Sequence, residues 1–281
     1  MVYLGIDIGG TSAKVAAVRD GRTLWTAQSP PYRQPDTAQL IQAIRVALDG
    51  RRYEVAAVGL CVPGLIDPRK RTTCAVNVPG LNGIALDELV CDALGVGSMR
   101  VQLLSDAVAT GFDLYAKRKL AGRLLSLAIG TGVGAAVLDD GVPLKVDGES
   151  PGHFGQLDVS IEGHPVVGPD GGAGSLEGYL GGPVLAAQHD DVPAAIAAWR
   201  GDELPLRALA RAIRIAHAIY RPHHVYLAGG IGIRLGHVLG GLRRLVEDRL
   251  SRIARTDWTL GVGDSEFHAV EGAARYAASN P

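Results

Sequence analysis

The sequence is poor in cysteine, aromatic residues and long apolar runs. Its three cysteines, Cys61, Cys74 and Cys91, form no CxxC pair. So sparse and odd a set is typical of reduced thiols and excludes a disulfide framework. No stretch reaches the roughly 20 apolar residues of a membrane span. The N-terminus also lacks the basic and apolar segments of a secretory signal. These absences predict a cytoplasmic protein.

The sequence also lacks blocks of charge of one sign. Lys and Arg number 28 against 29 Asp and Glu, for a net charge of −1, and the basic residues are scattered. Nucleic-acid and membrane surfaces are usually recognised by clustered basic residues. We therefore expect no nucleic acid and no membrane as partner, and expect a small molecule instead.

Strand-like apolar runs alternate with amphipathic helical patterns along the 281 residues, which predicts an α/β fold. One internal similarity stands out. Residues 4–21 (LGIDIGGTSAKVAAVRDG) resemble residues 124–141 (LLSLAIGTGVGAAVLDDG). Both segments read as a strand, a glycine turn, a second strand and an Asp-Gly turn. This predicts two similar lobes that each open with a hairpin, with a boundary near residues 115–123.

The two glycine turns are candidates for phosphate binding. They are Gly9-Gly10-Thr11 and Gly130-Thr131-Gly132. Without Cβ atoms, their backbone N–H groups can approach an anion closely. Neither is a Walker A loop, because the chain contains no GxxxxGK[ST]. Each turn alone could be an ordinary hairpin turn, but the matched pair favours a nucleotide. A third cluster, Gly229-Gly230, follows a strand and is the expected seat of the adenosine.

Two aspartates are candidates for chemistry at strand ends. Asp7 precedes the first glycine turn and could hold Mg²⁺, directly or through water. Asp106 ends the run VQLLSD and begins a helix. It could be a helix N-cap, a role that Ser105 could fill equally well. It could instead be a general base that accepts a proton from a substrate hydroxyl.

The order of these motifs resembles the ROK family of bacterial sugar kinases across nearly the whole chain. The matching segments are DIGGTSAK (7–14), VPGLID (62–67), SDAVATG (105–111), IGTGVG (129–134), LAGG (227–230) and the ending EGAARYAA. The resemblance implies a two-lobed, actin-like ATPase (ribonuclease H-like) fold with a central cleft. Residues 1–115 plus 268–281 would form the N-terminal lobe, with the first phosphate hairpin, the sugar site and the catalytic aspartate. Residues 116–267 would form the other lobe, with the second phosphate hairpin, the adenosine site and the oligomerisation surface.

By this resemblance the protein is an ATP-dependent kinase that phosphorylates a hydroxyl of a sugar or sugar-like polyol, with Mg²⁺ as cofactor and a homodimer as the expected assembly. Asp106 would be the catalytic base. The substrate-binding residues would be Asn77, Ser105, Asp106, His153 and Glu177. The residues that bind ATP and magnesium would be Asp7, Gly9, Gly10, Thr11, Lys14, Gly130, Thr131, Gly132, Gly229 and Gly230.

The sequence also departs from the family pattern. The histidine and three cysteines that bind zinc in the family are replaced by Gln156, Gly168, Asp170 and Ser175. Since structural zinc needs four Cys or His ligands, we expect no zinc site and a loop held by turns. In addition, His153 stands at the position of a sugar-binding glutamate, and Ser105 at that of an asparagine. These two changes put a preference for plain glucose in doubt.

Alternatives remain open at this point. The protein could be a catalytically weakened sugar-binding or regulatory member of the family, although no winged helix precedes the first hairpin. It could phosphorylate another acceptor, such as an aminosugar, an N-acylated sugar or an inositol-like polyol. The phosphoryl donor could also be polyphosphate rather than ATP.

Overall fold

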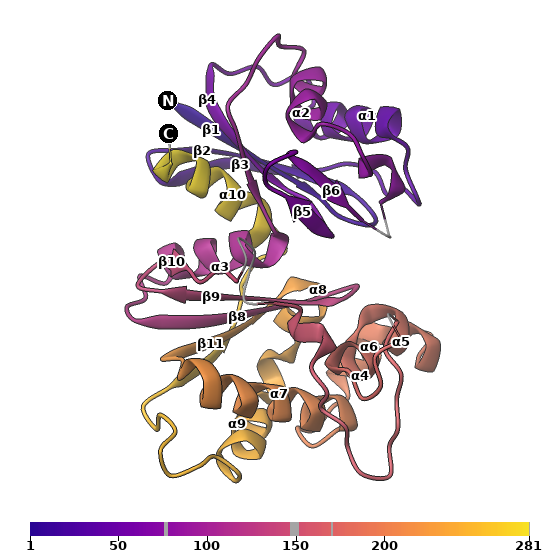
Figure 1. Cartoon of the computed structure of the whole chain (residues 1–281), viewed down its shortest axis with the longest axis vertical. Coiled ribbons are helices and arrows are strands. Elements are labelled where there is room, and N and C mark those ends of the chain that lie inside the picture. Colours follow the sequence, from indigo (N-terminus) through magenta and orange to yellow (C-terminus); the bar gives the residue numbers. More distant parts are fainter. Residues whose placement is uncertain (76–77, 147–151, 170, 281) are drawn as a thin grey trace. The chain divides into compact units, whose positions relative to one another are not determined.

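A computed structural model describes residues 1–281 except for 76–77, 147–151, 170 and 281. The chain forms two compact units (Figure 1). The first unit contains Met1–Leu114 and Phe267–Pro281, and the second contains Tyr115–Glu266. No helix of the described part is both long enough and apolar enough to cross a membrane.

The first unit is built on a five-stranded sheet in the order β3-β2-β1-β4-β7. β1 and β2 form an antiparallel hairpin that β3 extends, while β4 and β7 add in parallel to the other side of β1. The strands are β1 Val2–Ile8, β2 Ala13–Arg19, β3 Arg22–Gln28, β4 Val55–Cys61 and β7 Val101–Leu104. A separate two-stranded ribbon joins β5 Leu65–Asp67 to β6 Thr72–Cys74.

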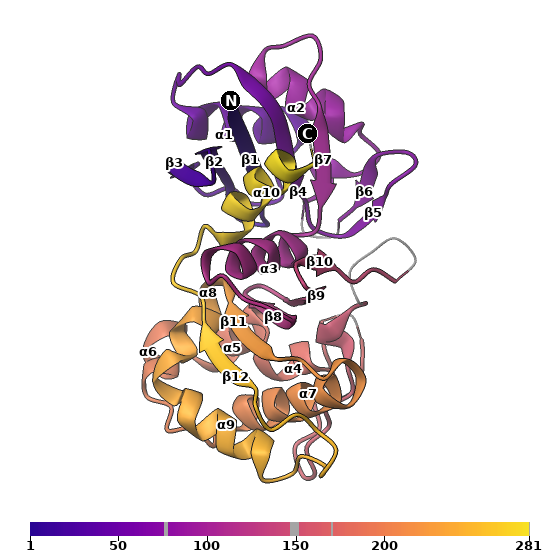
Figure 2. The same cartoon turned by 90° about the vertical axis from the view of Figure 1, so that its left-hand side faces the viewer.

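Helices cover this sheet. They are α1 Thr37–Leu48, α2 Leu86–Leu94 and α10 His268–Ser279, while α3 Asp106–Lys117 follows β7 and a short 3₁₀ turn, η1, spans Pro79–Leu81. α1 is fixed at its start by a capping box, in which the Asp36 carboxylate accepts from the Gln39 N–H at 2.8 Å. α1 packs on β2 and on α2, whereas α10 packs on β1, β4, β2 and β7 (Figure 2).

Glycines allow α10 to lie directly on the strands that lead to the candidate site. A Cβ atom at Gly5 of β1 would lie 1.8 Å from the Val270 carbonyl oxygen, and one at Gly59 of β4 would lie 2.0 Å from the Ala273 oxygen. Since carbon and oxygen cannot approach so closely, only glycine fits at either position. The backbone of α10 is therefore in contact with the backbones of both strands.

A buried ionic network fastens α10 to α3. The carboxylate of Asp113, which is fully buried, lies 2.6 Å from His268 Nδ1 and accepts from Arg275 Nε at 2.7 Å. Glu271 accepts a hydrogen bond from the Thr23 hydroxyl at 2.7 Å. Buried charges need such partners, so this network fixes the position of α10 along its axis.

The second unit repeats the sheet arrangement in the order β10-β9-β8-β11-β12. Its strands are β8 Arg123–Ile129, β9 Val133–Asp139, β10 Val142–Pro143, β11 His224–Ala228 and β12 Thr259–Val262. β8 and β9 form an antiparallel hairpin, and β11 and β12 add in parallel beside β8. The prediction that each half opens with a hairpin is therefore confirmed.

Helices and 3₁₀ turns complete the second unit. They are η2 Phe154–Gln156, α4 Leu176–Leu180, α5 Gly182–Gln188, α6 Val192–Ala197, α7 Leu204–Tyr220, α8 Gly229–Gly232, η3 Ile233–Val238 and α9 Leu239–Glu247. The long helix α7 buries Leu206, Leu209 and Ile213 in the core of the unit and packs against α4 and α9.

We predict that Gly59→Ala destabilises the protein by about 3 kcal/mol or prevents folding, because the added methyl group would overlap backbone atoms of α10 that cannot move aside. Gly97→Ala is the matched control, since a Cβ atom there meets nothing within 4 Å. Thermal unfolding of both variants checks the prediction. Equal melting temperatures would show that α10 is not held against β4 in this way.

Candidate functional site

The first glycine turn is tied to the segment that follows β3. Within the turn, the Gly9 N–H donates to the Ser12 carbonyl oxygen at 3.0 Å. The Tyr32 hydroxyl donates to the Gly9 oxygen at 2.8 Å, and the Tyr32 N–H donates to the Thr11 oxygen at 2.8 Å. The turn is thus held at both ends by Tyr32, while the side chain of Thr11 stays exposed.

Asp7 lies beside this turn and has an unusual pKa. It is the next-to-last residue of β1 and pairs with Lys14 across the hairpin and with Cys61 across β4. Burial first, and then the nearby carboxylate of Asp106, raise the pKa of Asp7 to about 7, whereas Lys14 opposes the shift. A carboxyl with such a pKa needs a further positive charge if it is to stay ionised below neutral pH.

Sheet register explains why Asp7 and Asp106 come together. β1, β4 and β7 are parallel neighbours, so Asp7 lies level with Cys61, which in turn lies level with Leu104. Asp106 follows Leu104 by two residues. The carboxyl ends of parallel strands meet at one edge of a sheet, where α/β proteins commonly bind ligands. The structure thus brings the two aspartates to one place.

Asp106 itself begins α3, but Ser105 is the residue that caps this helix. The Ser105 hydroxyl accepts from the Val108 N–H at 3.3 Å. One oxygen of Asp106 accepts from the adjacent Ala107 N–H at 2.7 Å. Loss of hydration beside the surrounding protein raises the pKa of Asp106, and the hydrogen bond from the Ala107 N–H works against that rise. Its side chain nevertheless keeps access to solvent, so the carboxylate remains available to a substrate.

The second glycine turn lies at the corresponding sheet edge of the second unit. The Gly130 N–H donates to the Gly132 oxygen at 2.9 Å, and the Gly130 oxygen accepts from the Gly182 N–H at 2.8 Å. Gly229 follows β11, the parallel neighbour of β8, with a φ of 77°. A Cβ atom there would lie 2.5 Å from the Ile129 oxygen, so only glycine fits. The turns at 130–132 and 229–230 are therefore neighbours.

Glu177 lies directly against the second turn. Its Oε2 accepts from the Val133 N–H at 3.3 Å. A Cβ atom at Gly132 would lie 3.0 Å from Oε1, and one at Gly155 would lie 2.7 Å from Oε2. The two glycines therefore leave the space that the carboxylate fills. Glu177 supports the turn through its backbone contact, in addition to the sugar contact that its sequence position predicts.

The other predicted substrate residues are less well defined. His153 precedes the short turn η2, and its side chain is exposed to solvent. Asn77 lies outside the described residues. Ser105 contributes its hydroxyl to the cap of α3.

The loop in which the sequence predicts no zinc site is held by hydrogen bonds. The Ser175 hydroxyl accepts from the Gly178 N–H at 3.2 Å and caps α4. Isolated bridges pair Asp158 with Ser175 and Val167 with Ala173. Hydrogen-bonded turns and bridges thus close the described part of this loop. The absence of a zinc site stays a prediction, and Asp170 lies outside the described residues.

Sequence reasoning missed three residues around the first turn. Tyr32 holds the turn, Cys61 lies beside Asp7, and the Phe267 ring lies 5.5 Å from Lys14 Nζ. Burial, and next the charges of Asp7 and Asp106, raise the pKa of the Cys61 thiol well above its usual value. Only the register of β1 on β4 could have indicated Cys61, and no local pattern points to the other two.

Comparison of the sequence with known protein families identifies the family of this chain. Residues 3–279 match the model of the ROK family. The chain belongs to the ROK family. An N-acetyl-D-glucosamine kinase of Escherichia fergusonii is 28% identical over 226 residues, which cover 72% of this chain and 73% of that protein.

Solved structures of family members confirm the predicted α/β, actin-like ATPase fold. A ROK hexokinase from Thermus thermophilus superimposes with a TM-score of 0.74 at 22% identity, covering 100% of this chain and 99% of the other. A ROK family glucokinase from Streptomyces griseus, in complex with glucose and AMPPNP, gives a TM-score of 0.75 at 22% identity, covering 99% of this chain and 100% of the other. At these identities the likeness shows the fold alone.

We predict that Asp7→Asn stabilises the free protein at pH 8 by about 1 kcal/mol or more. A carboxyl whose pKa is raised on folding binds more protons in the folded than in the unfolded chain. The stability that this carboxyl contributes is therefore lost as the pH rises from 3.8, the ordinary pKa of an aspartate, to about 7, its pKa in the folded protein. Asparagine removes this cost, so the gain in melting temperature should be largest above pH 7 and should shrink toward pH 4. A gain independent of pH would contradict the assigned pKa.

Proposed function

We propose that this ROK protein is an ATP-dependent carbohydrate kinase that transfers a phosphoryl group to a hydroxyl of a sugar or sugar-like polyol. The observation that carries the proposal is the placement of Asp106. Its solvent-accessible carboxylate lies at the same sheet edge as Asp7 and the glycine turn after β1. A base beside a phosphate-binding turn is the arrangement that phosphoryl transfer to an alcohol requires.

In the proposed mechanism Asp106 accepts the proton of the attacking hydroxyl. The raised pKa of its carboxyl favours proton transfer, since a base is most effective when its pKa approaches the working pH. General-base catalysis of this kind contributes roughly 10²–10⁴-fold to the rate. The remaining acceleration in phosphoryl transfer comes from holding the reactants in line and from neutralising charge on the phosphoryl oxygens.

ATP is the proposed phosphoryl donor. In the second unit, the turn Gly130-Thr131-Gly132 would offer backbone N–H groups to phosphate, and the adjacent Gly229-Gly230 would make room for the nucleoside. In the first unit, Gly9, Gly10 and Thr11 would offer further N–H groups, with the Lys14 side chain adding positive charge. The AMPPNP complex of the Streptomyces griseus glucokinase supports this choice of donor.

The first unit also fits a magnesium ion. Burial, and then the nearby charge of Asp106, raise the pKa of Asp7, and Lys14 opposes this shift only in part. A divalent cation with oxygen ligands would neutralise this repulsion. Asp7 is the residue proposed to hold Mg²⁺, directly or through water. When bound, the ion would withdraw charge from the phosphate oxygens.

The residues proposed to hold the sugar are Asn77 and Ser105 of the first unit and His153 and Glu177 of the second. Among acceptors, a hexose or an N-acylated aminosugar is favoured, because the Escherichia fergusonii relative is an N-acetyl-D-glucosamine kinase. His153 can donate and accept one hydrogen bond each, whereas a glutamate only accepts. A substrate that presents an acceptor, such as an amide carbonyl, would therefore suit this position.

The remaining assignments belong to the same proposal. The first unit would carry the base and the sugar residues Asn77 and Ser105, and the second would carry the remaining sugar residues, the adenosine site and the surface of a homodimer. The enzyme would act in the cytoplasm.

The decisive experiment measures ADP release over a panel of hexoses, aminosugars, N-acylated aminosugars and polyols, with ATP and polyphosphate as alternative donors. Asp106→Asn should lower kcat by about 10²–10⁴-fold and leave the melting temperature unchanged or higher, since the carboxyl is replaced by an amide of the same shape. Asp92→Asn, an exposed change on α2, is the control. If the wild-type protein binds a sugar without turnover, the result favours a sugar-binding regulator. If Asp106→Asn keeps full activity, Asp106 is not the base.

Glu177→Gln separates two roles of this side chain. The glutamine still offers an oxygen to the Val133 N–H, so the turn should persist, but a sugar hydroxyl loses a charged acceptor. We expect the KM for the sugar to rise about tenfold, as for loss of one hydrogen bond to a charged group, with the KM for ATP unchanged. If the KM for ATP rises instead, Glu177 acts by supporting the turn and is not a sugar ligand.

A further inference from the structure

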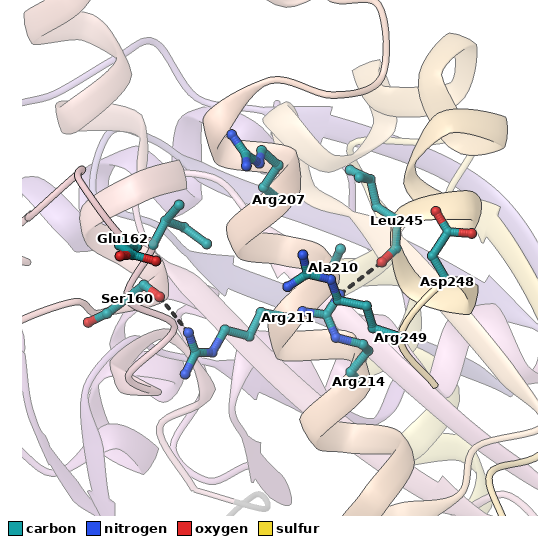
Figure 3. A pocket seen from close by; sticks show the side chains of 10 residues that line it. Ser160, Glu162, Arg207, Ala210, Arg211, Arg214, Leu245, Asp248 and Arg249 are labelled. Atoms are coloured by element: carbon teal, nitrogen blue, oxygen red, sulfur yellow. Dashed lines mark hydrogen bonds between the residues drawn. The ribbon is translucent and has the colours of Figure 1, made fainter. Parts of the chain in front are cut away.

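A second pocket lies in the second unit, on the outer side of α7. It has a volume of about 550 Å³ and lies among α7, the residues at the end of α9 and the segment 160–162 (Figure 3). It shares no residue with the turns at 130–132 and 229–230 or with Glu177. Any ligand of this pocket is therefore additional to the sugar and nucleotide proposed above.

Four arginines dominate the lining. Arg207, Arg211 and Arg214 follow one face of α7 at spacings of four and three residues, and Arg249 comes from the segment after α9. In Figure 3, Arg211 extends to the Ser160 carbonyl oxygen and Arg214 to the Leu245 oxygen, the latter at 2.8 Å. Among the described residues, none of the four forms an ion pair with a carboxylate.

Two of these arginines instead repel Arg214. Burial first, and then the charges of Arg249 and Arg211, lower the pKa of Arg214. Gathering like charges is unfavourable unless an anion offsets it, and guanidinium groups with unused N–H donors match the oxygens of a phosphate. The cost of this cluster points to a ligand that the chain itself does not supply.

The pocket also contains acceptors. Glu162 and Asp248 line it, so the lining carries four positive and two negative charges, a net +2. The nearby Asp158 lies outside the lining, and its oxygen accepts from the Ser160 hydroxyl and N–H. A phosphate monoester carries about −1.5 to −2 at pH 7. Carboxylates beside a phosphate site would repel a bare anion, but they accept hydrogen bonds from hydroxyl groups.

We propose that this pocket binds a small polyhydroxylated molecule that carries one phosphate monoester, with the phosphate on Arg211, Arg214 and Arg249 and the hydroxyls on Glu162 and Asp248. Sugar phosphates are the ligand class that combines these groups. The volume is within the roughly 300–1,000 Å³ usual for small-molecule sites. Ile161 and Leu245, which are partly exposed, supply an apolar wall for the carbon face of the sugar.

The test is calorimetric titration of the full-length chain with a hexose 6-phosphate, in the presence of saturating ADP and the unphosphorylated hexose to occupy the proposed catalytic site. Arg211→Gln and Arg249→Gln should each weaken binding about tenfold or more, as expected for loss of one charge-assisted contact. Both side chains are exposed, so both variants should fold. Arg244→Gln, an equal charge change at an exposed position of α9 outside the pocket, should bind like the wild type.

Two further readouts sharpen the test. Binding should weaken strongly when ionic strength rises from about 0.01 M to about 1 M, since the screening length falls from about 30 Å to about 3 Å. Inorganic phosphate and sulfate should bind more weakly than the hexose phosphate. Equal binding of all three anions, or unchanged affinity in both arginine variants, would overturn the proposal. The proposal would also be overturned if the arginine variants changed their oligomeric state in sedimentation while hexose phosphate binding stayed intact, because the arginines would then face a second copy of the chain. None of these outcomes depends on whether the chain is a kinase.

Discussion

The approach of two carboxylates at one sheet edge is the constraint on which the first unit depends. Burial, and then the nearby charge of Asp106, raise the pKa of Asp7, so the position of Asp106 disfavours ionisation of Asp7. A chain selected for stability alone would avoid this arrangement. The unit tolerates it because parallel pairing of β1, β4 and β7 fixes the register. Local instability of this kind is typical of functional sites rather than of packing.

Elements remote from the site keep that register. α10 touches β1 and β4 through positions where only glycine fits, and the buried carboxylate of Asp113 joins α10 to α3 through His268 and Arg275. Asp106 begins the same α3. A shift of α10 would therefore move both the strand that carries Asp7 and the helix that carries Asp106. Residues that never meet a substrate thus determine the distance between the two carboxylates.

Local sequence pattern was enough to predict the hairpins, the glycine turns and the aspartates at strand ends, because each follows from short-range preferences of the chain. It could not predict contacts that tertiary structure creates. Tyr32 reaches Gly9 from beyond β3, and Glu177 of α4 reaches Val133 of β9. The arginines of α7 are visible as a helical stripe, but Arg249 joins them only through helix packing. The N-cap role was ambiguous between Ser105 and Asp106 until geometry assigned it to Ser105.

The two units share a topology, but their chemistry differs, and the hairpins show why. In the first unit the turn spans residues 9–12, and Asp7 faces Lys14 across it. In the second unit the turn is one residue shorter, 130–132, and the facing pair is Ala128 and Gly134. The second hairpin therefore has no charged pair at this position, and Glu177 reaches its turn from α4. A repeated backbone thus supplies two glycine turns that we propose bind anions, and the first of them also lies beside the carboxylate pair proposed to serve a cation and a base.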